Sequence, residues 1–328
     1  MRFLTSRPAY DLTYHDVFMA PNRSNVTSRL DVDLTSTDGL NLPLPLVVAN
    51  MTAISGRRMA ETIARRGGIA VLPQDIPVDV LTQSIARVKA APTLFETPIT
   101  VTATTTIGEA LNLMSKRAHG AVVVIDENRI PLGLVSHSAT VGVDRYAQVH
   151  EVMTSGFALL GPDATPQEVF DTLSATRQRL AISVDHDSSL IGVMSAKGAL
   201  RSAIYRPALD AQARLKIAVA IGISGDAPGR AEALLNADAD VLVLDTAHGH
   251  QQRMIDALSA VRPVRDAFEA KTGRRAPLVA GNVVTAEGVN DLIEAGADVI
   301  KVGVGPGAMC TTRMQTGVGR PQFSAVLE

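Results

Sequence analysis

The sequence is poor in cysteine, because only Cys310 is found among its 328 residues. A single thiol excludes an intrachain disulfide, which is typical of proteins kept in a reducing compartment. The net charge of −2 gives no electrostatic reason to expect a nucleic acid as a partner. The N-terminus lacks the apolar region of a secretory signal, and no apolar run approaches the ~18 residues of a membrane helix. We therefore expect a cytoplasmic protein with neither nucleic acid nor membrane as its partner.

Two segments of the chain alternate short apolar runs with helical patterns, which favours an α/β fold with a parallel sheet. The predicted strands are 46–50, 68–72, 216–223, 240–244, 277–280 and 298–302, and the predicted helices are 56–66, 78–89, 229–236, 251–268 and 286–295. A (β/α)₈ TIM barrel closes with eight strands. We therefore expect most of such a barrel, with its last strands missing from this sequence.

The alternation stops at Pro92 and resumes after Pro207, and an internal repeat lies between them. The matching residues, always 59 positions apart, are Glu109 and Glu168, Asp126 and Asp185, and Ser136 and Ser195. Each copy indicates a strand, a helix, an Asp-tipped hairpin and a strand ending in Gly-φ-φ-Ser, where φ is apolar. We predict an insert at 93–205 between two parts of the barrel, 1–92 and 206–328.

The stretch 298–322 carries the strongest chemical signal. Its strand Val299–Val302 is apolar enough to be covered on both faces, and three glycines follow it within five residues. Glycines let backbone amides approach a ligand closely. Cys310, directly behind this loop, is a candidate nucleophile, whereas the alternative is a small buried hydrophobe. The polar neighbours and the glycines favour the nucleophile.

Polar side chains also follow other predicted strands. Asn50 and Met51 follow the first strand, Asp245 the fourth and Asn282 the fifth. Each alone is equally typical of a turn or a helix cap. Their gathering at the carboxyl ends of barrel strands, where barrels build active sites, predicts one active site with Cys310.

Two other interpretations of these segments are weaker. The G-x-G-x-G run at 303–307 contains Pro306 and lacks the third glycine of a dinucleotide-binding loop. His248 and His250 have no carboxylate or cysteine beside them at ligand spacing, so we do not expect them to hold a metal.

Five segments, in order along nearly the whole chain, carry a family resemblance. They are LTYHDVFMAP at 12–21, VVANM at 47–51, VLDTAHGH at 243–250, VAGNVVTAEG at 279–288, and GVGPGAMCTTR with TGVGRPQ at 303–322. Together they resemble the IMP dehydrogenase/GMP reductase family. The resemblance implies a barrel enzyme that acts on a purine mononucleotide, with Cys310 adding to purine C2 and Thr312 helping to position the leaving group or water.

The resemblance also implies roles for the other residues at the carboxyl ends of the barrel strands, which we call the rim. Substrate contacts are expected from Asn50, Met51, Asn282, Gly307 and Ala308. Contacts to a nicotinamide cofactor are expected from Asp245, Thr246, Ala247, Gly303, Val304 and Gly305. The backbone carbonyls of Gly305, Gly307 and Cys310 are expected to surround a monovalent cation such as K⁺.

The insert resembles a tandem pair of CBS modules, which implies ATP or GTP as its ligand. Such modules often hold a ribose with an Asp three residues after the Ser, and Ala139 and Gly198 stand there instead. A purely structural pair is therefore the alternative. The resemblance further implies a homotetramer, with octamers formed through pairing of the CBS modules.

The chain departs from the family pattern at three places. Ala308 replaces the usual Ser, 72–74 reads Leu-Pro-Gln instead of Ile-His-Lys, and 51–53 reads Met-Thr-Ala instead of Met-Asp-Thr. These differences indicate a divergent branch of the family that carries CBS modules.

The family carries out two reactions, and the residues that separate them lie past residue 328 in family order. Segments 316–319 and 279–282 look more like the reductases, whereas 245–250 and the CBS pair look more like bacterial dehydrogenases. We favour an NADPH-dependent GMP reductase, because the segment beside the nucleophile bears most directly on the chemistry. The alternatives are an NAD-dependent IMP dehydrogenase and a non-catalytic purine-nucleotide sensor.

Overall fold

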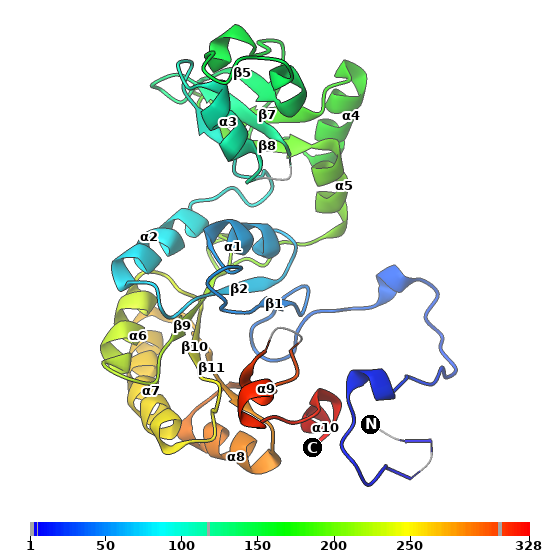
Figure 1. The fold of residues 1–328 in the computed structure, drawn as a ribbon, viewed down its shortest axis with the longest axis vertical. Coiled ribbons are helices and arrows are strands. Elements are labelled where there is room, and N and C mark those ends of the chain that lie inside the picture. The colour runs from blue at the N-terminus through cyan, green and yellow to red at the C-terminus, as the bar shows by residue number, and fades with distance from the viewer. Residues whose placement is uncertain (1–2, 5, 117–118, 308–309) are drawn as a thin grey trace. The chain divides into compact units, whose positions relative to one another are not determined.

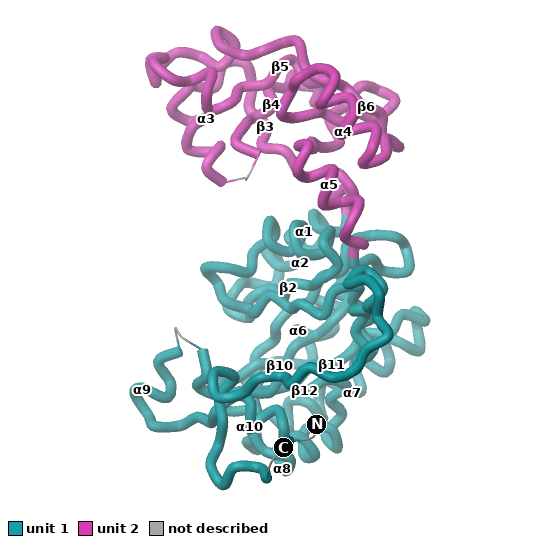
Figure 2. The backbone as a smooth tube through the Cα atoms, turned by 90° about the vertical axis from the view of Figure 1, so that its right-hand side faces the viewer, with its two compact units in different colours: residues 1–89, 208–328 teal, residues 90–207 magenta. Residues whose placement is uncertain are grey.

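The chain divides into two compact units, which Figure 2 shows in different colours. The computed structural model describes residues 3–4, 6–116, 119–307 and 310–328. One unit contains residues 1–89 and 208–328, and the other contains residues 90–207. Each unit has its own sheets and its own core, so each is described by itself.

The first unit is built on a six-stranded sheet in which every pairing is parallel. In spatial order its strands are β1 (Val47–Val48), β2 (Ile69–Leu72), β9 (Ala218–Ile221), β10 (Val241–Asp245), β11 (Leu278–Val283) and β12 (Val299–Val302). The spatial order follows the chain order, as it does in a barrel. The predicted α/β fold is confirmed as a parallel half-barrel.

Helices connect these strands and pack in a row, which Figure 1 shows from α6 to α8 along one side of the sheet. They are α1 (Arg57–Ala64), α2 (Val78–Lys89), α6 (Ala227–Asn236), α7 (Gln252–Thr272) and α8 (Ala286–Ala295), followed by α9 (Thr312–Thr316) and α10 (Gln322–Leu327). Local capping explains where they begin: the side chains of Asp226 and Thr285 accept hydrogen bonds from the backbones of Gly229 and Gly288.

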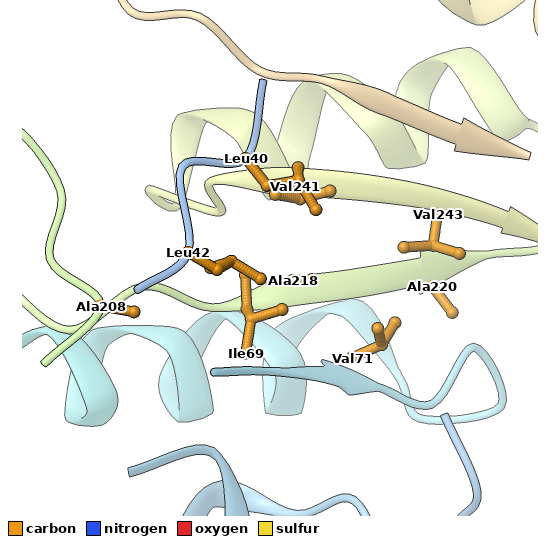
Figure 3. Packing of buried hydrophobic residues seen from close by; sticks show 9 residues of the cluster. All are labelled: Leu40, Leu42, Ile69, Val71, Ala208, Ala218, Ala220, Val241 and Val243. Atoms are coloured by element: carbon orange, nitrogen blue, oxygen red, sulfur yellow. The ribbon is translucent and has the colours of Figure 1, made fainter. Parts of the chain in front are cut away.

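Small and branched side chains form a core cluster on one face of the sheet, shown in Figure 3. Alternate strand residues share a face, which brings together Ile69, Val71, Ala218, Ala220, Val241 and Val243. Leu40 and Leu42 from the N-terminal arm and Ala208 complete the cluster. Among the described residues of the arm, the regular elements are two short 3₁₀ helices, Tyr14–Asp16 and Arg29–Asp31.

The two edge strands differ from expectation. Strand β12 was expected to be covered on both faces, but all four of its residues are only partly buried. Val47 of β1, at the other edge, is 50% exposed. Each edge strand is paired on one side only, so it lacks the cover that a second neighbour gives.

The second unit contains the sequence repeat as a structural repeat. The first copy has β3 (Thr100–Val101), α3 (Ile107–Met114), β4 (Ala121–Ile125), β5 (Pro131–Ser136) and the 3₁₀ helices His137–Thr140 and Val149–Glu151. The second has β6 (Ala158–Leu160), α4 (Pro166–Thr176), β7 (Leu180–Val184), β8 (Leu190–Ser195) and α5 (Ala196–Ile204). Both helices begin with a capping box, at Thr106 and at Thr165. Both sheets have one parallel and one antiparallel pairing.

A buried charge cluster connects the two chain segments of the first unit at the point where the second unit interrupts it. Lys89, the last residue before the second unit, lies with Nζ 2.9 Å from Asp210 Oδ2 and 2.6 Å from Asp240 Oδ2. Burial raises the pKa of Asp240 despite the nearby ammonium group. Burial also opposes ionisation of Asp210, but hydrogen bonds from Lys89 and the Arg214 backbone lower its pKa. The ammonium group of Lys89 therefore links the end of segment 1–89 to segment 208–328.

We predict that Lys89→Met destabilises the protein by about 3–5 kcal/mol, because it leaves the buried Asp240 without its cation and Asp210 with Arg214 alone. Urea unfolding followed by circular dichroism measures the loss. The matched control is Lys271→Met in α7, where the side chain is exposed. Equal stability of the two variants would contradict a clamping role for Lys89.

Candidate active site

Three polar side chains meet at the carboxyl ends of the barrel strands. Asn50, two residues after β1, donates from Nδ2 to Asp245 Oδ2 over 2.8 Å. The Lys301 ammonium group of β12 forms a salt bridge with Asp245 Oδ1 and lies 3.4 Å from Asn50 Oδ1. The network therefore joins the first and last strands of the sheet through the end of β10.

Strand register explains how Lys301 reaches Asp245. Asp245 pairs with Gly281, and Gly281 pairs with Lys301, so the three stand in one row across β10, β11 and β12. The outer two strands are about 10 Å apart, and side chains in one row share a face. A Cβ at Gly281 would collide with the Lys301 backbone oxygen and would lie only 2.7 Å from Lys301 Cβ. The glycine thus leaves room for the lysine beside the aspartate.

Asn282, the next residue of β11, connects two loops and carries an unsatisfied oxygen. Its Nδ2 donates to the Gly303 carbonyl over 2.7 Å, and its backbone pairs with Thr246 and Gly249. Within the described part of the chain, its buried Oδ1 has no hydrogen-bond partner. A buried acceptor without a partner is costly, so this atom suits a hydrogen-bond donor from a ligand.

The glycine loop has a backbone conformation that other residues rarely adopt. Gly303 has φ +128° and Gly305 has φ +78°. Gln322 Oε1 lies 2.3 Å from the position that a Cβ at Gly303 would take, and Gln322 Nε2 donates to Val302 O over 2.9 Å. Gln322 Oε1 is a second buried acceptor without a partner among the described residues. Two amide oxygens that can accept hydrogen bonds therefore flank the start of this loop.

Cys310 lies in a set of hydrogen-bond donors. Its backbone N–H donates to Gly307 O over 3.0 Å. The Thr312 side chain is the strongest influence on its thiol, with smaller contributions from the N–H groups of Thr312, Arg313 and Gly305. These donors stabilise the thiolate and lower the pKa of Cys310 below its ordinary value. The environment is that of a reactive thiol rather than an apolar filler.

The predicted site residues thus form two groups. Asn50 and Asp245 meet directly, and Cys310 groups with Gly305, Gly307 and Thr312. The remaining predicted positions are found as follows: Met51 is 50% exposed, Thr246 and Ala247 follow β10, Val304 is 8% exposed, and Ala308 lies outside the described residues. Sequence reasoning missed Lys301 and Gln322. The signal for Lys301 was a charge inside an otherwise apolar strand, and Gln322 offered none.

His248 and His250 have different surroundings. His250 Nε2 lies 2.7 Å from Asp291 Oδ2 in α8, whereas His248 is exposed in the loop. Over the residues that the structure describes, no three His, Cys, Asp or Glu side chains are placed to share a metal ion. No described helix combines the length and the apolar character needed to span a bilayer.

A parallel barrel sheet with a hydrogen-bonded thiol and polar side chains at its carboxyl edge defines an α/β-barrel enzyme of the nucleophilic type. The family model for the IMP dehydrogenase / GMP reductase domain matches residues 11–328. The chain belongs to this family, which confirms the resemblance seen in the sequence.

Individual relatives are similar along the whole chain. A GMP reductase of Mycobacterium tuberculosis is 52% identical over 329 residues, covering 100% of this chain and 67% of the relative. An IMP dehydrogenase of Nitrosopumilus maritimus is 33% identical, covering 97% of this chain and 66% of the relative. The chain thus spans about two thirds of the length of these curated relatives.

Solved structures give the same picture. A cysteine-to-alanine variant of Trypanosoma brucei GMP reductase has a TM-score of 0.63 and 30% identity, covering 98% of this chain and 74% of that one. The T. brucei enzyme in complex with guanosine 5'-triphosphate has a TM-score of 0.60 and 31% identity, covering 98% of this chain and 77% of that one.

We predict that Thr312→Val slows alkylation of Cys310 by iodoacetamide about fivefold at pH 7, because the thiolate loses its strongest donor. The lost donor raises the thiol pKa, so the midpoint of the alkylation rate against pH moves upward. Cys310 is the only cysteine, so total label uptake reports on this site alone. Thr316→Val is the control, since the Thr316 hydroxyl donates to Thr312 O. Identical midpoints in parent and Thr312→Val would contradict the role of Thr312.

Proposed function

We propose that this protein is a GMP reductase that converts GMP, NADPH and a proton into IMP, ammonia and NADP⁺. The observation that carries the choice is the 52% identity to the M. tuberculosis GMP reductase along the whole chain, against 33% for the N. maritimus IMP dehydrogenase. This identity bears out the preference drawn from the segment beside Cys310. The chain is accordingly a purine-nucleotide oxidoreductase.

The chemistry follows from the thiolate of Cys310. The sulfur adds to C2 of the guanine ring, the bond from C2 to its amino group breaks, and the amino group takes the bonding electron pair and a proton from solvent and leaves as ammonia. The purine is then held as a thioimidate. NADPH, when bound, would supply the hydride for C2, and Cys310 would then be released as a thiolate when its bond to C2 breaks and IMP leaves. Thr312, whose hydroxyl contacts the sulfur, is placed to steady the thiolate and the leaving group.

Nucleotide binding is proposed at the rim. The unpaired Asn282 Oδ1 fits a hydroxyl or N–H donor of the purine nucleotide. Asn50, Met51 and Gly307 complete the proposed substrate contacts together with Ala308. Because Ala308 has no hydroxyl group, we assign phosphate contacts to backbone N–H groups of this loop.

The hydride donor and a cation are assigned to the same rim. We place NADPH against Asp245, whose carboxylate can accept ribose hydroxyl groups, with further contacts from Thr246, Ala247, Gly303, Val304 and Gly305. The carbonyls of Gly305, Gly307 and Cys310 offer neutral oxygen ligands in a segment without carboxylates, which fits K⁺ better than a divalent ion. Bound there, K⁺ would brace the loop that carries the nucleophile.

The second unit is proposed to be a CBS pair that binds ATP or GTP. In support, equivalent hollows of about 530 and 660 Å³ lie beside the first strand and the helix of each copy. Three threonines, Asn112 and the single carboxylate of Glu109 line the first, whereas Asp163, Glu168 and Asp185 line the second. Three carboxylates repel phosphates more strongly than one, so we assign the nucleotide to the first copy. The T. brucei GMP reductase was crystallised with guanosine 5'-triphosphate.

We further propose a cytoplasmic homotetramer, with octamers forming through the CBS pair. The N-terminal arm supports assembly, because it exposes large apolar side chains that a monomer rarely leaves in water. Phe18 is 96% exposed, Met19 95% and Leu30 86%.

The predicted products separate the candidate functions. Full chain incubated with GMP and NADPH should release IMP and ammonia, and the same chain with IMP and NAD should form little XMP. Cys310→Ala should lower turnover at least about 1,000-fold, because no other thiol is present to attack C2. Chromatography of the nucleotides and an ammonia assay measure both reactions. XMP as the main product would favour the dehydrogenase, and activity with neither pair would favour the sensor.

A further inference from the structure

We infer that Lys301 is a positioning residue of this reaction. It holds the side chains of Asp245 and Asn50 in the orientation that binds the cofactor and the nucleotide. The inference rests on the proposed function, which gives NADPH and GMP as the ligands of this site. The strand register explains why Lys301 lies beside Asp245. Lys301 lies one strand beyond Gly281 and two beyond Asp245 in a single row.

The Asp245 carboxylate is held at both of its oxygens. Oδ1 pairs with the Lys301 ammonium group, and Oδ2 accepts the amide N–H of Asn50 over 2.8 Å. Each carboxylate oxygen has two acceptor positions, so both keep one for a ligand hydroxyl. Rotation of the carboxylate is thus restricted before any ligand arrives, and this preorganisation favours binding and correct placement.

The charge arrangement favours a local role at the site over a role in folding. The side chain of Lys301 is 33% exposed and that of Asp245 19%, so the pair is only partly shielded from water. Ion pairs with this exposure contribute little to stability. The Lys301 ammonium group supplies a positive charge directly beside the Asp245 carboxylate.

A second lysine in the same unit provides the contrast. Lys216 precedes β9, at the opposite end of the sheet, and its Nζ donates to the Leu40 carbonyl over 2.7 Å. Burial lowers the pKa of Lys216, and its partner is the backbone of the arm that covers the core. Lys216 thus fastens the arm, whereas Lys301 holds two side chains at the rim.

The test compares Lys301→Met, Lys301→Arg, Asp245→Asn, the double variant Lys301→Met with Asp245→Asn, and Lys216→Met. We expect Lys301→Met to lower kcat about 100-fold and to weaken NADPH binding about tenfold, because the carboxylate is no longer held in place. Its Tm should stay within about 2 °C of the parent, because the ion pair is partly exposed. Lys301→Arg should recover most of kcat, and Lys216→Met should lower Tm while kcat is kept.

The double variant decides whether Lys301 acts through Asp245. If it does, the double variant loses no more activity than Asp245→Asn alone. Three results would each overturn the inference. The first is a double variant whose loss of activity is the product of the two single losses, and the second is a Lys301→Met variant with kcat and NADPH affinity within threefold of the parent. The third is a fall in the Tm of Lys301→Met that Lys301→Arg does not recover. NADPH binding is titrated by fluorescence without turnover. If the parent binds NADPH but does not reduce GMP, the proposed function fails while the titration still decides the role of Lys301.

Discussion

The parallel, in-register pairing of β10, β11 and β12 is the constraint on which the site depends. It places Asp245, Gly281 and Lys301 in one row at the carboxyl edge of the sheet. The missing side chain at Gly281 lets the charged pair form, and Asn50 extends the network to the first strand. A register slip of one residue would turn the shifted side chains to the other face of the sheet and break the contacts among Asn50, Asp245 and Lys301.

The same strands carry the loop that holds the nucleophile. Asn282 follows Gly281 and is hydrogen-bonded to Gly303, the first residue after β12. The loop then turns through Gly305 and brings donors around the Cys310 sulfur. The loop of the nucleophile and Lys301 of the network therefore both belong to or follow β12, which explains how a thiol on a loop can be held at a defined place.

Much of this could be predicted from the sequence, because local patterns determine it. Parallel strands buried on both faces read as short apolar runs, the repeat has a constant spacing, and Cys310 is a lone thiol behind a glycine loop. The Lys301–Asp245 pair could not be predicted, because it depends on the register of three strands far apart in sequence. The partial exposure of β12 depends on how many strands flank it, which no local pattern reports.

In the proposed reaction, a hydride passes to C2 of a purine that is held by Cys310. The most direct test of this step uses NADPH deuterated at both C4 positions, GMP, and mass spectrometry of the nucleotide product. The account predicts IMP that carries one deuterium at C2 from the parent chain, and none of this product from Cys310→Ala. Unlabelled IMP, or labelled IMP formed equally well without the thiol, would contradict it.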